Sequence, residues 1–256
     1  AARYGIAVED WLDLSTGINP IPFNPPEIPL AAWARLPQEY DGQQDGLEAA
    51  AARYYATSDL LPISGSQAAI QLLPHLRSRC RAGVLHPGYA EHAHAWRSAE
   101  HEVKELRADE IAAQINNLDV LVLMQPNNPT GEIFAHAQLR EWHTQLAARG
   151  GWLIVDEAFV EASTQTSFAP PQMPHGLIVL RSLGKFFGLA GARVGFVLAH
   201  TELLARLRAA LGPWSVAGPS RYVAQAALLD GTWQAETRER LLQDGARLAQ
   251  LLSGAG

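Results

Sequence analysis

The sequence predicts an α/β protein whose mainly parallel sheet is covered by helices on both faces. Short runs of continuously apolar residues recur along the chain from Leu60 onwards, and segments with helical patterning separate them. Continuous apolar runs are typical of strands buried on both faces, and their alternation with helices indicates parallel connections. Small and polar residues follow several of these runs directly, which points to a site at one edge of the sheet.

Length and composition favour a globular enzyme or binding domain. The 256 residues are 48% hydrophobic and 18% charged, which is enough for a sizeable core. A net charge of −6 gives no support for nucleic-acid binding or a membrane surface. The single cysteine, Cys80, excludes an intramolecular disulfide and fits a reducing compartment, so we expect a cytoplasmic protein. The absence of an initiator methionine and the end in a helical pattern predict a piece of a longer protein.

The first segment, residues 1–44, is predicted to be an irregular arm on the surface. Six prolines between Pro20 and Pro37 argue against regular elements there. A helix from Asp45 to Tyr55 follows, with Asp45 as its expected N-cap. The denser basic groups, Arg77 to Arg81 and Arg238 to Arg247, are interpreted as solvated helix faces.

From residue 60 onwards, apolar runs predict strands and the segments between them predict helices. The expected strands are 84–86, 103–106, 119–124, 152–155, 177–180 and 195–198. The further expected helices are 67–76, 89–99, 109–116, 136–149, 202–211, 220–229 and 233–252. Ligands of such sheets bind beyond the carboxyl ends of the strands. The candidate residues at those positions are Gly65, Ser66, Gln67, Tyr89, Asn128, Asp156, Ser182 and Lys185.

Lys185 has the surroundings of a reactive lysine. It follows the apolar run 177–180 and lies between glycine and phenylalanine, with Arg193 eight positions further on. A lysine in an apolar loop loses hydration of its charged form, which favours the neutral, nucleophilic amine. A lysine that forms a Schiff base needs that property.

The remaining candidates suit the other parts of one cofactor. Gly65, Ser66 and Gln67 open a helix whose free N–H groups favour a phosphate, and Ser182 and Arg193 add a hydroxyl and a cation. Asp156 suits a protonated ring nitrogen, Asn128 a phenolic oxygen, and Tyr89 offers a stacking face. Together with an aldehyde for the lysine, these groups describe pyridoxal 5′-phosphate.

Each candidate also has a purely structural interpretation. Gly65-Ser66 can be a simple N-cap, residues 128–131 a turn, Asp156 a cap, Tyr89 a core residue, and Lys185 a surface lysine. The joint pattern is what favours the cofactor.

Other chemistries fit the sequence less well. Val179 and Phe186 stand where a phosphate-binding P-loop around Lys185 would need glycine and Ser/Thr. His92 and His94 diverge on a predicted helix, so we expect no metal site, and the histidines are interpreted as surface or hydrogen-bonded core residues. Asp156 and Glu157 should point in opposite directions, which argues against a carboxylate pair.

Three motifs resemble those of the fold-type-I pyridoxal-phosphate enzymes, the class I/II aminotransferase superfamily. They are Pro126-Asn127-Asn128-Pro129-Thr130-Gly131, Asp156-Glu157-Ala158-Phe159, and Ser182-Leu183-Gly184-Lys185 with Arg193 beyond. The resemblance runs from about Asp13 to the end of the chain. It is strongest to the histidinol-phosphate aminotransferase and L-threonine-O-3-phosphate decarboxylase branches.

The resemblance implies a three-layer large domain and assigns roles by position. Lys185 matches the lysine that holds the cofactor, Asp156 the partner of the ring nitrogen, Asn128 the ligand of the ring oxygen, and Tyr89 the stacking aromatic. The phosphate cup matches Gly65, Ser66, Gln67, Ser182 and Arg193, and Tyr40 matches a tyrosine that reaches the neighbouring subunit in the family's dimers. The implied domains are an arm at 1–44, a cofactor-binding domain at 45–220, and at 221–256 the start of a small domain largely outside the chain.

Two features favour the decarboxylase branch of cobalamin biosynthesis. The segment from Ser15 to Pro20 resembles its Ser-x-x-Ile-Asn-Pro pattern, and Phe159 stands where aminotransferases usually carry tyrosine. The resemblance then implies a cytoplasmic homodimer that acts on a small phosphorylated amino acid, namely decarboxylation of L-threonine O-3-phosphate. An aminotransferase of the histidinol-phosphate type is the alternative, followed by a non-catalytic binding module, which would not need Lys185, Asp156 and Arg193 together.

Overall fold

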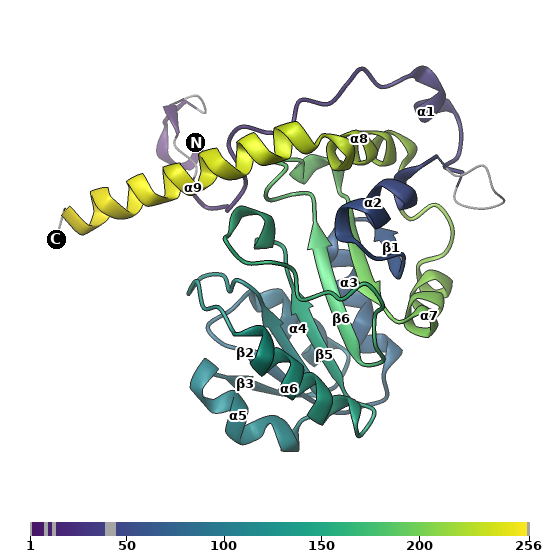
Figure 1. Ribbon diagram of the computed structural model, residues 1–256, viewed down its shortest axis with the longest axis vertical. Helices are drawn as coiled ribbons and strands as arrows, with labels where there is room; N and C mark the ends of the chain where they lie inside the picture. Colours follow the sequence, from purple (N-terminus) through teal and green to yellow (C-terminus); the bar gives the residue numbers. More distant parts are fainter. Residues whose placement is uncertain (1, 8–9, 12–13, 39–44, 255–256) are drawn as a thin grey trace.

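A computed structural model describes residues 2–7, 10–11, 14–38 and 45–254, and its centre is a seven-stranded sheet (Figure 1). The strand order is β1-β7-β6-β5-β4-β2-β3. The strands from β3 to β6 in this order run parallel, whereas β7 is antiparallel to both of its neighbours. This arrangement confirms the predicted mainly parallel sheet. The strands are β1 Leu60–Ile63, β2 Arg81–Leu85, β3 Glu102–Leu106, β4 Val120–Met124, β5 Trp152–Asp156, β6 Leu177–Ser182 and β7 Gly195–Ala199.

Helices cover both faces of the sheet, so the fold has three layers. Leucines and alanines of α2, α6 and α8 pack in one buried cluster with Val155 and Val179, and those of α3, α4 and α7 pack in another with Ile154 and Ile178. Adjacent residues of β5 and β6 thus enter opposite cores, as the alternation along a strand requires. The helices are α1 Leu30–Ala34, α2 Leu47–Tyr55, α3 Ser66–Leu72, α4 Ala90–Ser98, α5 Ile111–Gln114, α6 His136–Ala147, α7 Thr201–Leu211, α8 Gly218–Leu229 and α9 Gly231–Gly254.

The sequence did not predict β1. Pro62 lies inside this strand opposite Phe196 of β7, and a proline within an apolar run argues against a strand. The fold accommodates it because β1 is an edge strand, where one row of backbone groups needs no partner in the sheet. The sheet is mixed because of β7, which is antiparallel to both β1 and β6.

The arm is less peripheral than predicted. Phe23 is buried in the core, and its N–H donates to the carbonyl of Phe187 at 2.9 Å. The short helix α1 begins directly after Pro29, at the position where a proline is compatible with a helix start. At the next helix, the N-cap of α2 is Gly46 instead of Asp45, although Asp45 Oδ1 does accept the N–H of Leu47 at 3.2 Å.

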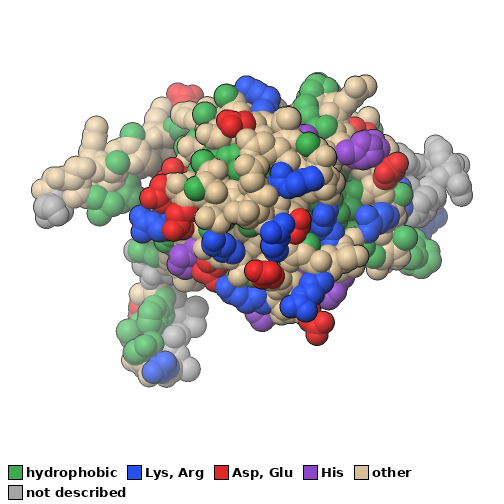
Figure 2. Space-filling view, turned by 90° about the horizontal axis from the view of Figure 1, so that it is seen from below, with side chains coloured by type: hydrophobic (Ala, Val, Ile, Leu, Met, Phe, Trp, Pro, Cys, Tyr) green, Lys and Arg blue, Asp and Glu red, His purple; other side chains and the backbone are tan. Residues whose placement is uncertain are grey.

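The interpretation of the basic groups as solvated helix faces was wrong in part. Arg77 to Arg81 lie on a loop and the first residue of β2, where Arg81 pairs with Asp119 at 3.4 Å. Seen from the end of the molecule that lies lowest in Figure 1, basic and acidic side chains are interspersed (Figure 2). Arg238 of α9 is partly buried, with its guanidinium carbon 5.5 Å from the ring centroid of Phe186.

The last helix, α9, projects past the body of the molecule (Figure 1). Its outer turns carry exposed leucines, among them Leu248, Leu251 and Leu252. Within the described part of the chain, no helix has the length and apolar character needed to cross a membrane.

Candidate functional site

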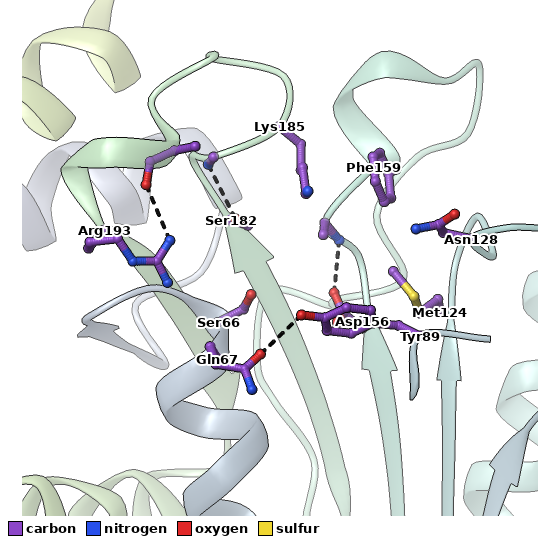
Figure 3. Close-up of a pocket in the computed structure, with 13 residues that line it drawn as sticks. Ser66, Gln67, Tyr89, Met124, Asn128, Asp156, Phe159, Ser182, Lys185 and Arg193 are labelled. Atoms are coloured by element: carbon purple, nitrogen blue, oxygen red, sulfur yellow. Dashed lines mark hydrogen bonds between the residues drawn. The ribbon is translucent and has the colours of Figure 1, made fainter. Parts of the chain in front are cut away.

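A pocket at the carboxyl ends of the strands brings most of the predicted residues together (Figure 3). Its volume is about 150 Å³. Eight predicted residues line it, namely Ser66, Gln67, Tyr89, Asn128, Asp156, Ser182, Lys185 and Arg193. The rest of the lining is apolar: Phe159, which the sequence analysis used to distinguish the two branches, and Met124, Ala158, Gly184 and Ala190, which were not among the candidates. Gly65 lies behind Ser66, and Tyr40 falls outside the described residues.

The topology of the sheet explains this convergence. Asp156 is the last residue of β5 and Ser182 the last of β6, and these two strands are parallel neighbours. Ser66 begins α3, and Tyr89 directly precedes α4. Parallel strands end at the same edge of the sheet, so residues more than a hundred positions apart meet there.

Lys185 enters the pocket from the loop after β6 (Figure 3). Its Nζ lies 5.4 Å from the centroid of the Phe159 ring, and the side chain is half-buried. The carbonyl oxygen of Lys185 accepts hydrogen bonds from the N–H groups of Asn19 at 3.0 Å and Gly188 at 3.1 Å. The amine is thus presented to the pocket by a main chain that is fixed on two sides.

Asp156 is 2% exposed and has two partners. Its Oδ1 accepts the N–H of Ala158 at 3.0 Å, and its Oδ2 lies 3.0 Å from Nε2 of the buried His92. These bonds fix the direction of the carboxylate at the floor of the pocket. The structural interpretation of Asp156 as a cap is also confirmed, because its carboxylate accepts the N–H of Ala158 two residues further on.

His92 is the residue that sequence reasoning missed. It was considered as a metal ligand and assigned to the surface or core, yet it orients the one carboxylate of the site. A signal was present: His92 lies three residues after Tyr89, which places it one turn into the helix that starts beside the pocket.

Arg193 lines the pocket, and Gly65, which does not, lies against its guanidinium. A Cβ at Gly65 would lie 2.5 Å from Nη2 of Arg193, and the φ of Gly65 is +76°. The guanidinium also donates to the carbonyl of Ala190 at 3.2 Å, which fixes its direction. Glycine thus leaves room for a cation beside Ser66 and Ser182, an arrangement suited to a phosphate.

Tyr89 stands at the mouth of the pocket, 41% exposed, so the alternative of a core residue was wrong. Its hydroxyl donates to Gln67 Oε1 at 3.3 Å, while Gln67 Nε2 donates to Glu91 at 2.8 Å. Partial burial raises the pKa of the Tyr89 phenol. These bonds hold the ring in one orientation, as a stacking surface requires.

The pocket therefore fits pyridoxal phosphate by its donor set. Two cations, Lys185 and Arg193, and one anion, Asp156, line it, with hydroxyl groups near the cation of Arg193.

The structure also brings together His175, His200 and Glu202, whose ligand atoms lie within 4.8 Å of one another. This group lies where β6 and α7 begin, away from the pocket.

If the pocket holds pyridoxal phosphate, alanine at Gly65 is expected to weaken its binding about tenfold, since the added methyl group must displace the Arg193 guanidinium. The positive φ adds about 1–3 kcal/mol of strain. Titration of the apoprotein with pyridoxal phosphate, followed by absorbance, measures the dissociation constant. Gly191→Ala is the matched control, because a Cβ there meets nothing within 4 Å. Unchanged affinity in Gly65→Ala would contradict the assignment of the cradle.

Comparisons with known proteins identify the family. The family model "Aminotransferase class I and II" matches residues 34–256. A threonine-phosphate decarboxylase of Pseudomonas aeruginosa is 55% identical over all of this chain and 76% of its own length. That of Salmonella typhimurium is 31% identical over 98% of this chain and 74% of its own. A histidinol-phosphate aminotransferase structure from Clostridium acetobutylicum shares the fold, with a TM-score of 0.81, 21% identity, and coverage of 96% of this chain and 78% of that one.

Proposed function

The chain belongs to the class I and II aminotransferase family, and we propose that it is a pyridoxal-phosphate-dependent lyase that decarboxylates L-threonine O-3-phosphate. The product is (R)-1-aminopropan-2-yl phosphate, an intermediate of cobalamin biosynthesis. The observation that carries the proposal is the 55% and 43% identity with two threonine-phosphate decarboxylases over the whole chain. The family prediction made from the motifs is thereby confirmed.

The described residues fit the cofactor in the following way. Lys185 would hold it covalently, Asp156 would partner the ring nitrogen, Tyr89 would offer the stacking face, and Asn128 would serve the ring oxygen. The residues that would hold the phosphate are Gly65, Ser66, Gln67, Ser182 and Arg193. When bound, pyridoxal phosphate supplies an electron sink for the pair left at Cα as the carboxylate departs as CO₂.

The chain's own residues then act on charge and protons. The Asp156 carboxylate, held by His92 and the N–H of Ala158, would stabilise a proton on the ring nitrogen of the bound cofactor. The amine of Lys185, which enters the pocket, would return a proton to Cα after CO₂ has left. Loss of CO₂ and gain of this one proton convert the amino acid into the amine.

Phe159 favours this reaction over transamination. Its ring lies beside Lys185 and carries no hydroxyl, so Asn128 is the polar side chain for the ring oxygen. The ring is packed tightly on its other side, since a Cβ at Gly17 would lie 2.8 Å from Phe159 Cε1. The arm segment that resembles the decarboxylase pattern thus contacts the residue that distinguishes the two branches.

The proposal includes a cytoplasmic homodimer. Large apolar side chains of the arm are exposed, among them Leu30 at 79%, Trp33 at 64% and Leu36 at 63%, and a second subunit would cover them. Tyr40, which follows in the chain, would then reach the neighbour's phosphate. The division into an arm, a cofactor domain at 45–220 and a small domain from 221 stays a prediction.

The reaction is tested with the full-length protein loaded with pyridoxal phosphate and given L-threonine O-3-phosphate. We expect release of one CO₂ per aminopropanol phosphate, without need for a keto acid. Turnover that requires 2-oxoglutarate and forms glutamate, with no CO₂, would identify an aminotransferase instead. A protein that takes up no pyridoxal phosphate would refute the cofactor itself.

A further inference from the structure

We propose that Arg181, Glu157 and Glu161 form a buried positioning cluster that sets Asp156 and Ser182 for the cofactor. None of the three lines the pocket, so any effect on the chemistry acts through their neighbours. The inference rests on the proposed function, because it concerns how the same site is held.

The three side chains are buried, and hydrogen bonds and ion pairs connect them. Arg181 is 4% exposed, Glu157 0% and Glu161 5%. Arg181 donates through Nη1 to Glu157 Oε2 at 2.9 Å and through Nη2 to Glu161 Oε1 at 2.5 Å. Glu157 additionally accepts the N–H of Phe168 and the hydroxyl of Ser167, both at 2.6 Å. The guanidinium lies 4.7 Å from the ring centroid of Tyr55, which closes the remaining side.

The position of the cluster in the sheet connects it to the site. Glu157 follows Asp156 directly at the end of β5, and Arg181 precedes Ser182 at the end of β6. Successive residues of a strand point to opposite faces, so the cluster binds the reverse side of the same two strand ends. The N–H of Glu157 also donates to the carbonyl of Leu180 at 2.9 Å. The Glu157–Arg181 pair therefore fixes the register in which Asp156 and Ser182 face the pocket.

Glu161 extends this control to Phe159. It lies in the 3₁₀ turn Val160–Ala162 that directly follows Phe159, and its side chain is bonded to Arg181. The carbonyl of Glu161 accepts a hydrogen bond from Nε of Arg238 in α9 at 3.3 Å. The turn that holds the Phe159 ring against Lys185 is thus tied both to β6 and to α9.

The stability of the fold does not by itself explain why these three residues are charged. Two carboxylates face one guanidinium, and burial raises the pKa of Glu157 despite the attraction of Arg181. Among the described residues, Glu161 Oε2 and Arg181 Nε are buried without a hydrogen-bond partner. Well-packed apolar side chains often stabilise a fold as well as such an ion cluster does. An ion cluster, unlike apolar packing, fixes the orientation of each bonded group, and an active site needs such fixed orientations.

The chain offers a matched control. Arg221 is a second buried arginine with two carboxylates, since it binds Asp45 and Glu48 between α2 and α8. Its carboxylate partners do not line the pocket. Replacing either arginine by methionine removes a buried guanidinium from two carboxylates, which are buried at Arg181 and 32% and 21% exposed at Arg221, so the control measures the cost of losing a buried arginine away from the pocket.

The experiment compares Arg181→Met with Arg221→Met in the protein loaded with pyridoxal phosphate. We expect both to lower the midpoint of thermal unfolding of the apoprotein. Only Arg181→Met should lower kcat, by roughly 100-fold for a displacement near 1 Å. It should also shift the pH at which the visible absorption of the bound cofactor changes, whereas a loss of stability alone would leave that pH unchanged.

Glu161→Gln keeps the size of the side chain and covers the case in which Arg181→Met does not fold. We expect a smaller loss of kcat, about tenfold, with KM nearly unchanged. Wild-type kcat and absorption profile in the folded Arg181 variant or in Glu161→Gln would overturn the inference, as would equal effects from Arg221→Met. Failure of the wild-type protein to take up the cofactor would instead refute the proposed function.

Discussion

Alanine at Lys185 is expected to lower the decarboxylation rate by on the order of 10⁴-fold, because both the covalent hold on the cofactor and the proton donor for Cα are lost. The side chain enters the pocket from a loop whose main chain is fixed by Asn19 and Gly188, and no other lysine lines the pocket among the described residues. Rates of CO₂ release from the loaded wild-type and variant proteins measure the effect. Binding without a covalent bond should persist at reduced affinity, through Arg193 and the serines.

The composition of the chain gives this prediction a clean control. Lys104 is the one other lysine in the sequence, and its Nζ donates to Gln114 at 2.7 Å beside β3. Borohydride reduction of the yellow protein should trap label on Lys185 in the wild type and in Lys104→Ala, and none in Lys185→Ala. Label on Lys104, or full activity in Lys185→Ala, would contradict the assignment.

Asparagine at Asp156 is expected to lower kcat by on the order of 10³-fold, with a much smaller change in cofactor affinity. The substitution keeps the shape of the side chain but removes the buried charge that stabilises a protonated ring nitrogen. The bond to Ala158 N–H can remain, so the fold should be retained. Steady-state kinetics and the absorption spectrum of the bound cofactor measure the two effects separately.

Two further variants decide whether the charge of Asp156 is responsible. His92→Phe keeps the carboxylate but removes the ring nitrogen 3.0 Å from it, and should cost about tenfold in kcat. Asp119→Asn removes an exposed partner of Arg81 outside the pocket and should leave the kinetics unchanged. If Asp156→Asn were as active as Asp119→Asn, Asp156 would have no electrostatic role.

The motifs alone identified the family because each one combines a residue with its local setting. Asn128 between prolines, Asp156 after an apolar strand, and Lys185 with Arg193 beyond it are all properties of short segments. The parallel sheet then implied that these segments meet, and the structure confirms that they do. The opposite directions of Asp156 and Glu157 also followed from strand alternation, as their separate partners His92 and Arg181 show.

The prediction failed where the partner of a residue is remote. His92 is separated from Asp156 by 64 positions, and its place one turn into the helix after Tyr89 does not by itself identify Asp156 as its partner. The arm shows the same limit: six prolines predicted a surface segment, yet Phe23 is buried and Asn19 bonds the main chain of Lys185 and Phe186. Pro62 argued against a strand that an edge position permits.

The sequence by itself thus determined the α/β class, the strand ends and the chemical identity of the groups that meet there. Hydrophobic periodicity and turn-forming residues are properties of short segments, so they can be recognised in the sequence alone. Only the tertiary structure decided which residues support the site from outside the pocket. They are His92, which bonds Asp156 on one face of the sheet, and Arg181 with its two glutamates on the other face. The identity of these partners depends on packing between segments that are far apart in the chain. A buried charge needs a partner, and only the packing brings a particular side chain next to it.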